Sequence, residues 1–480
     1  MMSARAGHAG LIVLVLLAVA TSAASAGQGD PVNEHRRSIT DTSVDMPGAA
    51  ALWRTLTLRD YNTRVVVIGT TLLGIAAGVV GTFAYLRKRS LMGDALSHAT
   101  LPGIAAAFML TGDKKLGPLL AGAALTGLLG VLAVTALRRW SRLKEDAAIG
   151  IVLSVFFAMG MVLFSLIQQQ GTGAEAGLRT FIYGKAAAMV ARDARLIGWT
   201  ALVVIVGAGL LFKEFRVVCF DAAFAGASGF PVVVIDLLMM ALVVATTVIG
   251  LQAVGLILVV ALLIIPAAAA RFWTDHLTSM TVLAATIGAL SGWLGSTVSA
   301  LVPRLPAGAV IVISAGALFL VSMFLAPRRG VLAEVVRRWA LSRKVAFQHL
   351  LRALAELEER HGGGAGLRFD DVFARRSWSP NQLQRLIRRA VGAGVLTPAG
   401  LPLLQLTDSG RAHARRILRN HRLWEVYLIK YADIAPSHVD RDADEVEHVL
   451  SDEIIQELEA ALAAEPPIPP SPHALEGDRP

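Results

Sequence analysis

An aspartate and a histidine stand four residues apart in the stretch SLMGDALSHA, residues 90–99, within a long apolar part of the sequence. On a helix, Asp94 and His98 lie on one face, one turn apart. A carboxylate oxygen and an imidazole nitrogen together suit a divalent first-row ion such as manganese, iron or zinc. Two ligands from one chain leave the coordination shell incomplete, so the ion can leave again, and a dimer would supply a second pair.

A purely structural role is also consistent with this spacing. In that interpretation, Asp94 caps a short helix and His98 donates a hydrogen bond that supports packing. Two other polar residues interrupt the apolar region. Asp236 lies close to the predicted edge of an apolar stretch, which favours a solvated position, and Gln252 is predicted to make a packing hydrogen bond.

The composition separates the chain into two parts. Of its 480 residues, 55% are hydrophobic and only 17% are charged, with a net charge of +9 and a mean hydropathy of +0.59. These values exclude a wholly soluble protein and a mainly disordered chain. The single cysteine, Cys219, excludes an intramolecular disulfide framework and a Cys-rich metal site. About half of the charged residues follow Pro327, so we predict a membrane part and then a soluble part.

The amino terminus has the build of a targeting segment. The apolar run LIVLVLLAVA (11–20) follows Arg5 and precedes a small-residue site at Ala24-Ser25-Ala26. Residues 1–26 therefore predict a secretory signal peptide or an uncleaved signal anchor. Both alternatives place the polar segment over 27–62 outside the cytoplasm.

Nine apolar stretches follow, and a membrane-spanning helix needs about 20 such residues. Basic residues follow every second stretch, so the positive-inside rule predicts a multi-pass inner-membrane protein with an external amino terminus and a cytoplasmic carboxyl terminus. A re-entrant element near 90–111 would reverse part of this scheme. The runs are continuous and rich in Gly and Ala, which predicts a helix bundle and excludes a barrel. The stretches lie near 65–86, 96–111, 117–137, 147–167, 194–212, 231–249, 252–270, 279–301 and 308–326.

Residues 213–231, KEFRVVCFDAAFAGASGFP, connect two of these stretches on the predicted cytoplasmic side. Small and apolar residues alternate and the segment ends in Gly-Phe-Pro. This pattern predicts a short amphipathic helix across the membrane face. Such a helix is either a grip for a partner protein or an ordinary interfacial helix.

Three segments together resemble the membrane permeases of metal-ion ABC transporters, which import manganese, zinc and iron. The segments are LRKRSLMGDALSHATLPGIAAAFML (86–110), FRVVCFDAAFAGASGFP (215–231) and QAVGLILVVALLIIPAAAAR (252–271), in the order and spacing of that family. The resemblance implies a permease domain over 63–327 in which Asp94 and His98 line the metal path.

The resemblance also implies a set of partners. The segment at 215–231 matches the helix that docks on the ATPase subunit, with Phe215, Asp221, Ala225 and Gly229 as its marked positions. The sequence contains no GxxxxGK[ST] loop for phosphate binding, so we expect a non-enzymatic subunit that works with a separate ATPase. An extracytoplasmic metal-binding protein would deliver the ion, and a second permease subunit, identical or different, would complete the path. The metal is cargo, and no permanently bound cofactor is expected.

The tail over 328–464 has the element order of a winged helix. We predict helices over 331–360, near 368–376, over 380–392 and over 408–431, with a hairpin wing at 395–406. The third of these helices carries side chains suited to phosphate and base-edge contacts. They are Asn381, Gln382, Gln384, Arg385, Arg388 and Arg389. The basic charge also suits a protein-interaction module beside an anionic membrane.

The end of the tail offers a second group of metal-type ligands. The segments LTDSGRAHARRILRNHRLWEVYL (406–428) and DADEVEHVLSDEI (442–454) resemble the diphtheria-toxin-repressor and manganese-transport-regulator family. The first-helix ligand positions of that family fall on Gln348 and Leu351, and leucine binds no metal. Solvated helix charge is the competing explanation. The positions that match family ligands are His421, Asp444, Glu447 and His448, with Glu425 as an accessory ligand.

These observations predict an all-α membrane protein with about nine transmembrane helices and a cytoplasmic winged-helix domain. The leading hypothesis is the permease subunit of an ABC importer of manganese, iron or zinc, with manganese or iron favoured by the tail. The alternative is a membrane-tethered, metal-responsive DNA-binding regulator, although an anchor needs only one span. In a combined hypothesis, cytosolic metal binds the tail and inhibits transport. Residues 465–480 predict a disordered tail.

Overall fold

The computed structural model describes residues 55, 57–112, 116–169, 186, 189–302, 305–361, 367–374, 378–397, 403–431 and 452–461. The chain divides into two compact units, Met1–Ala333 and Glu334–Pro480. The predicted targeting segment over 1–26, the polar segment as far as residue 54 and the predicted disordered tail lie outside the described residues.

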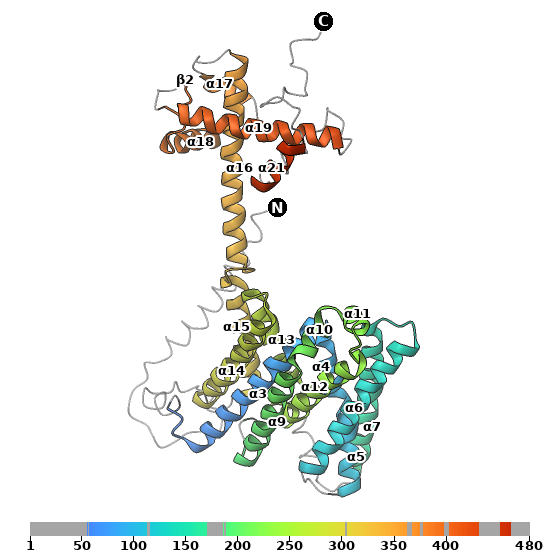
Figure 1. Cartoon of the computed structure of the whole chain (residues 1–480). Coiled ribbons are helices and arrows are strands. Elements are labelled where there is room, and N and C mark those ends of the chain that lie inside the picture. Colours follow the sequence, from blue (N-terminus) through green and yellow to red (C-terminus); the bar gives the residue numbers. More distant parts are fainter. Residues whose placement is uncertain are drawn as a thin grey trace, which may run out of the picture. The chain divides into compact units, whose positions relative to one another are not determined.

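Seven helices of the first unit, counted among the described residues, are long and apolar enough to cross a membrane. They form one helical bundle (Figure 1). Their bounds are α3 (Tyr61–Leu86), α6 (Leu116–Trp140), α7 (Glu145–Gln169), α9 (Ala191–Leu210), α12 (Val232–Val254), α14 (Leu277–Leu301) and α15 (Ala307–Leu325).

The other two predicted spans correspond to shorter helices, so the predicted count of about nine is approximate for the described residues. The stretch near 96–111 is divided between α4 (Ser90–Ala99) and α5 (Leu101–Thr111). Pro102 lies in the first turn of α5, where its missing N–H costs no helical hydrogen bond. The stretch near 252–270 becomes α13 (Leu256–Trp273), which Gly255 separates from α12 with a φ of 90° that favours glycine.

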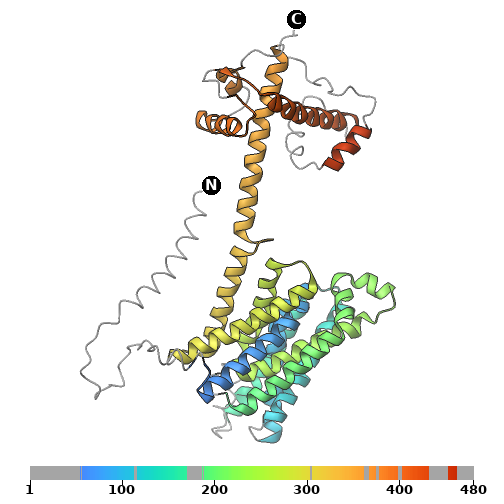
Figure 2. The ribbon, with the colours of Figure 1, turned by 60° about the vertical axis from the view of Figure 1, so that its left-hand side comes forward.

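Small residues allow the helices of the bundle to approach closely. α3 packs along α14 through the middle of the unit (Figure 2). At their crossing, a Cβ added to Gly74 or to Gly288 would lie 2.1 Å from the carbonyl oxygen of the other glycine. No side chain fits at that distance, so the predicted role of glycine in helix packing is confirmed at this crossing.

The second unit contains the predicted winged-helix elements. A long helix, α16 (Val331–Arg360), is followed by α17 (Phe369–Ala374), α18 (Pro380–Gly392), α19 (Asp408–Tyr431) and α21 (Asp452–Ala461). Strands β1 (Leu367–Arg368) and β2 (Leu403–Leu404) pair antiparallel, with Leu367 opposite Leu404, and Leu396 bridges Leu406 in the wing.

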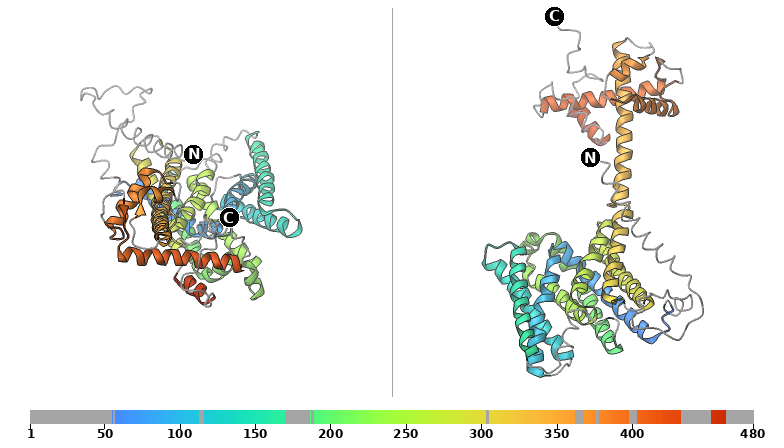
Figure 3. Two further views of the ribbon diagram at one scale, coloured as in Figure 1. Left: turned by 90° about the horizontal axis from the view of Figure 1, so that it is seen from above. Right: turned by 180° about the vertical axis from the view of Figure 1, so that it is seen from behind.

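The helices of the second unit share one apolar core. Leu350, Leu351 and Leu354 of α16 are fully buried against side chains of α17, α18, the wing and α19. Leu351, the residue at a family metal-ligand position, is therefore a core residue. α19 lies across α16 (Figure 3), and the two helices are joined by an ion pair between Arg411 Nε and Glu358 Oε1 at 2.7 Å.

Candidate functional site

Asp94 and His98 face each other on α4. Asp94 Oδ1 and His98 Nε2 are 3.6 Å apart. Two atoms bound at about 2.0–2.2 Å from one metal ion lie about 3.0–3.6 Å apart, so this separation suits two ligands of the same ion. The N-cap of α4 is Arg89, and Asp94 lies in the middle of the helix, so the carboxylate does not cap it.

The pair lies on the accessible face of an otherwise buried helix. Among the α4 side chains whose burial is described, only Leu91, Asp94 and His98 escape burial. The side chains of Asp94 and His98 keep 40% and 19% of their surface exposed. In a single copy of the chain, the other helices of the bundle therefore leave this face of α4 uncovered.

The imidazole of His98 is held from one side. Its ring meets the edge of the Phe157 ring of α7, with ring centroids 4.9 Å apart. Its Nδ1 is buried and has no hydrogen-bond partner among the described residues. A buried ring nitrogen without a partner calls for an explanation, and a ligand or an ordered water supplies one.

The described residues add no third ligand to this pair. No group of three or more His, Cys, Asp or Glu side chains suited to a metal ion occurs among them. One copy of the chain thus offers one carboxylate oxygen and one imidazole nitrogen, a donor set too small to complete the coordination shell of a metal ion.

The segment predicted to contact a partner forms two short helices rather than one. They are α10 (Phe212–Phe220) and α11 (Ala222–Ala227), and Asp221 separates them as the N-cap of α11, accepting a hydrogen bond from the Phe224 N–H at 2.8 Å. Gly229 ends α11 with a φ of 84°, and Phe230 N–H donates to the carbonyl of Ala225 at 3.0 Å. This is a Schellman cap, which favours glycine at that position.

One side of this segment is anchored and the other is free. Phe215 and Ala225 are fully buried, and the ring of Phe215 meets the ring of Phe83 on α3 with centroids 5.2 Å apart. By contrast, Phe220, Phe224 and Phe230 are exposed to 65%, 61% and 38%. The exposed rings form an apolar surface, which we call the phenylalanine patch, on a firmly held base.

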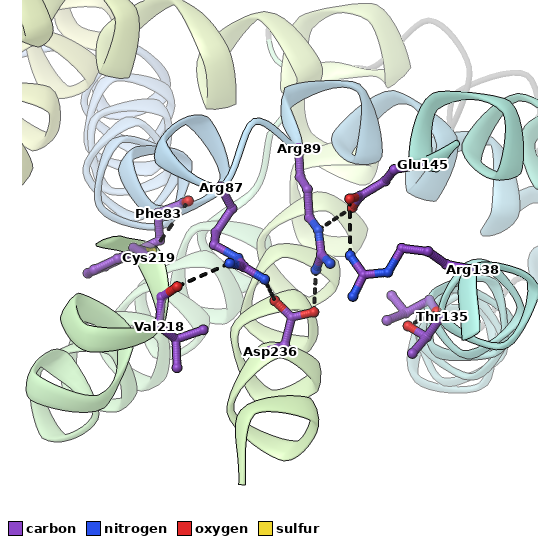
Figure 4. Close-up of polar contacts among 10 residues, drawn as sticks. Phe83, Arg87, Arg89, Thr135, Arg138, Glu145, Val218, Cys219 and Asp236 are labelled. Atoms are coloured by element: carbon purple, nitrogen blue, oxygen red, sulfur yellow. Dashed lines mark hydrogen bonds and ion pairs between the residues drawn. The ribbon is translucent and has the colours of Figure 1, made fainter. Parts of the chain in front are cut away.

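Asp236 is buried, and the prediction of a solvated position was wrong. Only 5% of the residue is exposed. Its carboxylate is paired with Arg87 and Arg89, the residues that flank the turn between α3 and α4 (Figure 4). In the sequence, both arginines belong to the basic residues that follow the first apolar stretch, which indicate membrane topology and give no sign of a partner. Burial also raises the pKa of the nearby Cys219 thiol to about 11.

A second buried acid lies near the start of α9. Asp193 is 5% exposed and accepts a hydrogen bond from Gln252 Nε2 of α12 at 3.0 Å. The packing hydrogen bond predicted for Gln252 is therefore confirmed. Asp193 also receives the backbone N–H of Val190 at 3.4 Å, so it stabilises the first turn of α9.

The second unit holds a histidine and a carboxylate at the same spacing. His421 and Glu425 of α19 are each 2% exposed, and His421 Nε2 lies 3.1 Å from Glu425 Oε1. On the other side of the ring, Nδ1 lies 3.0 Å from Arg352 Nη1 of α16. Arginine is always charged, so the guanidinium donates this hydrogen bond.

In this arrangement both ring nitrogens of His421 are engaged, so a metal ion could bind there only if Arg352 moved away from the ring. The other predicted tail ligands, Asp444, Glu447 and His448, lie outside the described residues.

The polar residues predicted on α18 are all exposed, but two of them are already engaged. Gln382 accepts the backbone N–H of Ser379 at 3.0 Å in a capping box. Arg389 donates to the carbonyl of Arg343 at 3.1 Å and lies over the ring of Phe347. The residues without such a tertiary or capping role on the exposed face are Asn381, Gln384, Arg385 and Arg388.

Comparison with known proteins gives a consistent result. The model of the ABC 3 transport family matches residues 59–326, and the model "Iron dependent repressor, metal binding and dimerisation domain" matches residues 407–465. The manganese transport system membrane protein MntC of Bacillus subtilis is 40% identical over 392 residues, which cover 82% of this chain and 89% of the relative. The zinc transport system membrane protein TroC of Treponema pallidum is 46% identical over 285 residues, covering 59% and 95%.

A solved structure agrees with these relatives. PsaBC from Streptococcus pneumoniae in complex with Fab is 34% identical, with a TM-score of 0.50 over 58% of this chain and 97% of that chain. The first unit of our chain ends at Ala333 of 480 residues, so the match to MntC over 82% of the chain extends into the second unit. The chain is a multi-pass membrane protein that belongs to the ABC 3 transport family and carries an iron-dependent-repressor domain at its carboxyl end.

Proposed function

We propose that this chain is the permease subunit of an ABC importer of divalent metal ions, and that Asp94 and His98 hold the ion during passage. The observation that carries the proposal is the carboxylate–imidazole pair on the open face of α4, 3.6 Å apart, with a buried ring nitrogen that lacks a described partner. Ionisable groups within a membrane bundle are costly and mark ion paths.

The depth of the pair supports the same role. Along an α-helix each residue advances about 1.5 Å, so Asp94 lies about 6 Å and His98 about 12 Å from the start of α4. A hydrocarbon layer is about 30 Å thick, so His98 lies near its middle if α4 begins at the interface. A second copy of the chain, or a related subunit, facing α4 would add the ligands that one copy lacks.

Manganese is the favoured cargo, ahead of iron and zinc. The donor pair suits all three ions. The relative that matches into the second unit is named as a manganese transport protein, whereas the zinc relative covers only 59% of the chain. The repressor-like domain, described as iron dependent, is consistent with manganese or iron.

The energy for transport must come from another protein, because the sequence lacks a phosphate-binding loop. We assign the phenylalanine patch on α10 and α11 to docking of an ATPase subunit. Three exposed phenylalanines on a base anchored by Phe215 offer the apolar anchors that interfaces use. This assignment places the patch and the second unit in the cytoplasm, and an extracytoplasmic protein delivers the ion to the opposite end.

The proposal is tested by Asp94→Asn in the full chain, co-expressed with its ATPase subunit. Uptake of manganese into cells should fall to background, because the neutral amide removes the charge that attracts the ion. The matched control is Asp60→Asn, since Asp60 is an exposed acid at the N-terminus of α3 without a side-chain capping bond. Normal uptake by the Asp94 variant, at equal protein in the membrane, would overturn the assigned path.

For the second unit we propose feedback on transport by cytosolic metal, rather than DNA binding alone. Removal of residues 331–480 should raise uptake only when internal manganese is high. Unchanged uptake by the truncated chain would contradict this role. A gel-shift measurement on the full chain in detergent then tests whether the exposed arginines of α18 still bind DNA.

A further inference from the structure

A cluster of charged side chains gathers where α3 ends and where α4, α7 and α12 begin. Asp236 of α12 lies at its centre, and Figure 4 shows the guanidinium groups of Arg87 and Arg89 directed at its carboxylate. Asp236 Oδ1 lies 3.4 Å from Arg87 Nη2, and Oδ2 is paired with Arg89 Nη1. The three side chains are buried, with 15% of Arg87, 6% of Arg89 and 8% of Asp236 exposed.

Arg87 links this cluster to the segment that carries the phenylalanine patch. Its Nη1 donates to the backbone carbonyl of Val218 in α10 at 3.0 Å. The same guanidinium thus holds α10 with one nitrogen and Asp236 with another. The edge contact between the rings of Phe83 and Phe215 lies beside this bridge and fixes α10 against α3.

Arg89 links the cluster to the start of the helix that carries Asp94 and His98. It is the N-cap of α4, and its side chain is paired with Asp236 on one side and with Glu145 of α7 on the other. Glu145 in turn accepts a hydrogen bond from Arg138 Nη1 of α6 at 3.0 Å. The beginning of α4 is therefore held by charged contacts to α12 and α7.

α4 is a separate short helix of ten residues. Before it, Lys88 adopts a φ of 58°, a left-handed conformation that is unusual for lysine. After it, Thr100 keeps a helical backbone, and α5 begins at Leu101 with Pro102 in its first turn. A small cavity also borders α4, lined by Gly81, Ala84, Tyr85, Gly93, Val243, Leu263 and Ile264.

Stability alone does not account for the cluster. Removing charges from water costs about as much as their attraction returns, so apolar side chains would stabilise the same place equally well. What the charges add is direction, because each guanidinium fixes two partners at defined positions. A shift of α10 along the bundle end would pull on Arg87, and through Asp236 on Arg89.

We propose that the Arg87–Asp236–Arg89 bridge transmits movement of α10 to α4, so that docking events at the phenylalanine patch change the access of Asp94 and His98. This inference rests on the proposed function of the patch and of the pair. Arg87 and Arg89 are positioning residues, since neither touches the site of the ion. The structure supplies a short separate helix and a continuous set of contacts that runs from the docking segment to it.

The test uses the full chain reconstituted in liposomes with its ATPase subunit, and manganese ions as the probe. Arg87→Met removes the link to Val218 and leaves the pairing of Asp236 with Arg89. Variants along coupling networks change coupling by about two- to thirtyfold, so we expect the manganese transported per ATP hydrolysed to fall by about tenfold. Equilibrium dialysis should give manganese binding at Asp94 and His98 within about twofold of the unchanged chain.

Arg271→Met is the matched control. Arg271 is also an arginine at the end of a span that holds a carboxylate, Asp275 at 3.1 Å, and a backbone carbonyl, that of Thr274 at 3.4 Å. Among the described residues it makes no hydrogen bond or ion pair to α4 or α10, so the ratio of ions to ATP should stay within about twofold. An unchanged ratio in Arg87→Met, or an equal loss in both variants, overturns the inference.

If Arg87→Met does not reach the membrane, Glu145→Gln tests the proposed bridge instead. Glu145→Gln weakens the other tie of Arg89 at a side chain that is 30% exposed. We expect a loss of about threefold in ions per ATP, and an unchanged ratio overturns the inference. The proposed function fails separately: if Asp94→Asn transports normally, the path is wrong, whereas a blocked Asp94→Asn beside a normal Arg87→Met rejects only the bridge.

Discussion

Two regions of the molecule carry a carboxylate and an imidazole at the same helical spacing, and their surroundings differ. On α4 the pair lies on the accessible face, with 40% of the Asp94 side chain and 19% of the His98 side chain exposed. On α19 the pair is buried, with 2% of the His421 side chain and 3% of the Glu425 side chain exposed.

The charged groups around the two pairs also differ. The guanidinium of Arg352 donates to His421, and no comparable donor reaches the ring of His98, whose Nδ1 has no partner among the described residues. The four-residue spacing therefore brings a carboxylate and an imidazole together, and the presence or absence of a neighbouring arginine determines the role of the pair. A pair without a fixed cation attracts a mobile one, whereas a pair with a fixed cation becomes a link between two helices.

The largest expected difference between the pairs is in uptake. His98→Ala should reduce manganese uptake by about a hundredfold or more, because loss of a metal ligand exceeds the ten- to hundredfold cost of losing a supporting contact. His421→Ala should leave uptake within about twofold at low internal manganese. Metal accumulation in cells, normalised to membrane-inserted protein, measures both. Comparable losses in the two variants would break the comparison.

The second expected difference is in stability, and here the α19 pair should matter more than the α4 pair. Glu425→Leu leaves the buried His421 without its carboxylate, so the unfolding free energy of the second unit should fall by about 3–5 kcal/mol. Asp94→Leu removes a partly exposed pair and should cost less than about 1 kcal/mol. Pulse proteolysis of the solubilised full chain over a urea series reports both values.

The matched control for the stability measurement is Glu334→Leu. Glu334 lies on the surface of α16, where Arg338 Nε pairs with it at 2.7 Å, and such exposed pairs contribute little. A loss of stability in Glu425→Leu no greater than that of Glu334→Leu would show that burial of the α19 pair does not matter.

The third difference concerns metal affinity of the second unit. Arg352→Gln removes the fixed cation beside His421 and should lower the manganese concentration for half-maximal response by about tenfold, or about 1.4 kcal/mol. The response is the fluorescence of Trp424, which stacks on Tyr427 with ring centroids 5.2 Å apart. The titration uses full chain that carries Asp94→Ala, so that the membrane pair does not bind.

Two variants keep this titration specific. Trp424→Phe should abolish the signal. Arg411→Gln removes another arginine that joins α19 to α16, through Glu358 at 2.7 Å, whereas the contacts described for Arg411 are to Glu358 and Asp408 rather than to His421. The manganese affinity of the chain with Arg411→Gln should match that of the chain in which Arg411 is unchanged. A response in Arg352→Gln that is equal to or weaker than that of the unaltered tail would refute the role of the fixed cation.

Elements with strong local signals were predictable from the sequence. The helices over 380–392 and 408–431 were placed at their observed bounds, because Ser379-Pro380 gives a cap and a first turn and Thr407-Asp408 begins the next helix. Hydropathy also located each membrane helix. It did not give the start of α4 at Ser90, ahead of the stretch predicted near 96–111, because Asp94 and His98 lower the hydropathy there.

Contacts between distant residues were not predictable in this way. Asp236 is 149 residues from Arg87 and 147 from Arg89 in the chain, so the residues near Asp236 in the sequence do not predict these partners. Likewise Arg352 meets His421 across 69 residues. The i, i+4 pairs were found because one helix supplies both members. What surrounds them depends on packing between helices, which one sequence does not reveal.

The smallest expected effect is a dependence of tail stability on pH through a third histidine. His413 of α19 precedes His421 by two turns, and burial together with the nearby charge of Arg416 lowers the pKa of its imidazole below the usual 6.5. The unfolded chain therefore binds a proton more readily than the folded one. Stability of the second unit should fall as the pH drops from 6.5 through the lowered pKa.

His413→Gln should flatten this part of the pH profile, because glutamine does not titrate. The urea midpoint of the second unit in the full chain, measured between pH 7.5 and 5, gives the profile, and His276→Gln in the first unit is the control. A profile that stays equally steep in His413→Gln would show that another group of the second unit titrates in this range.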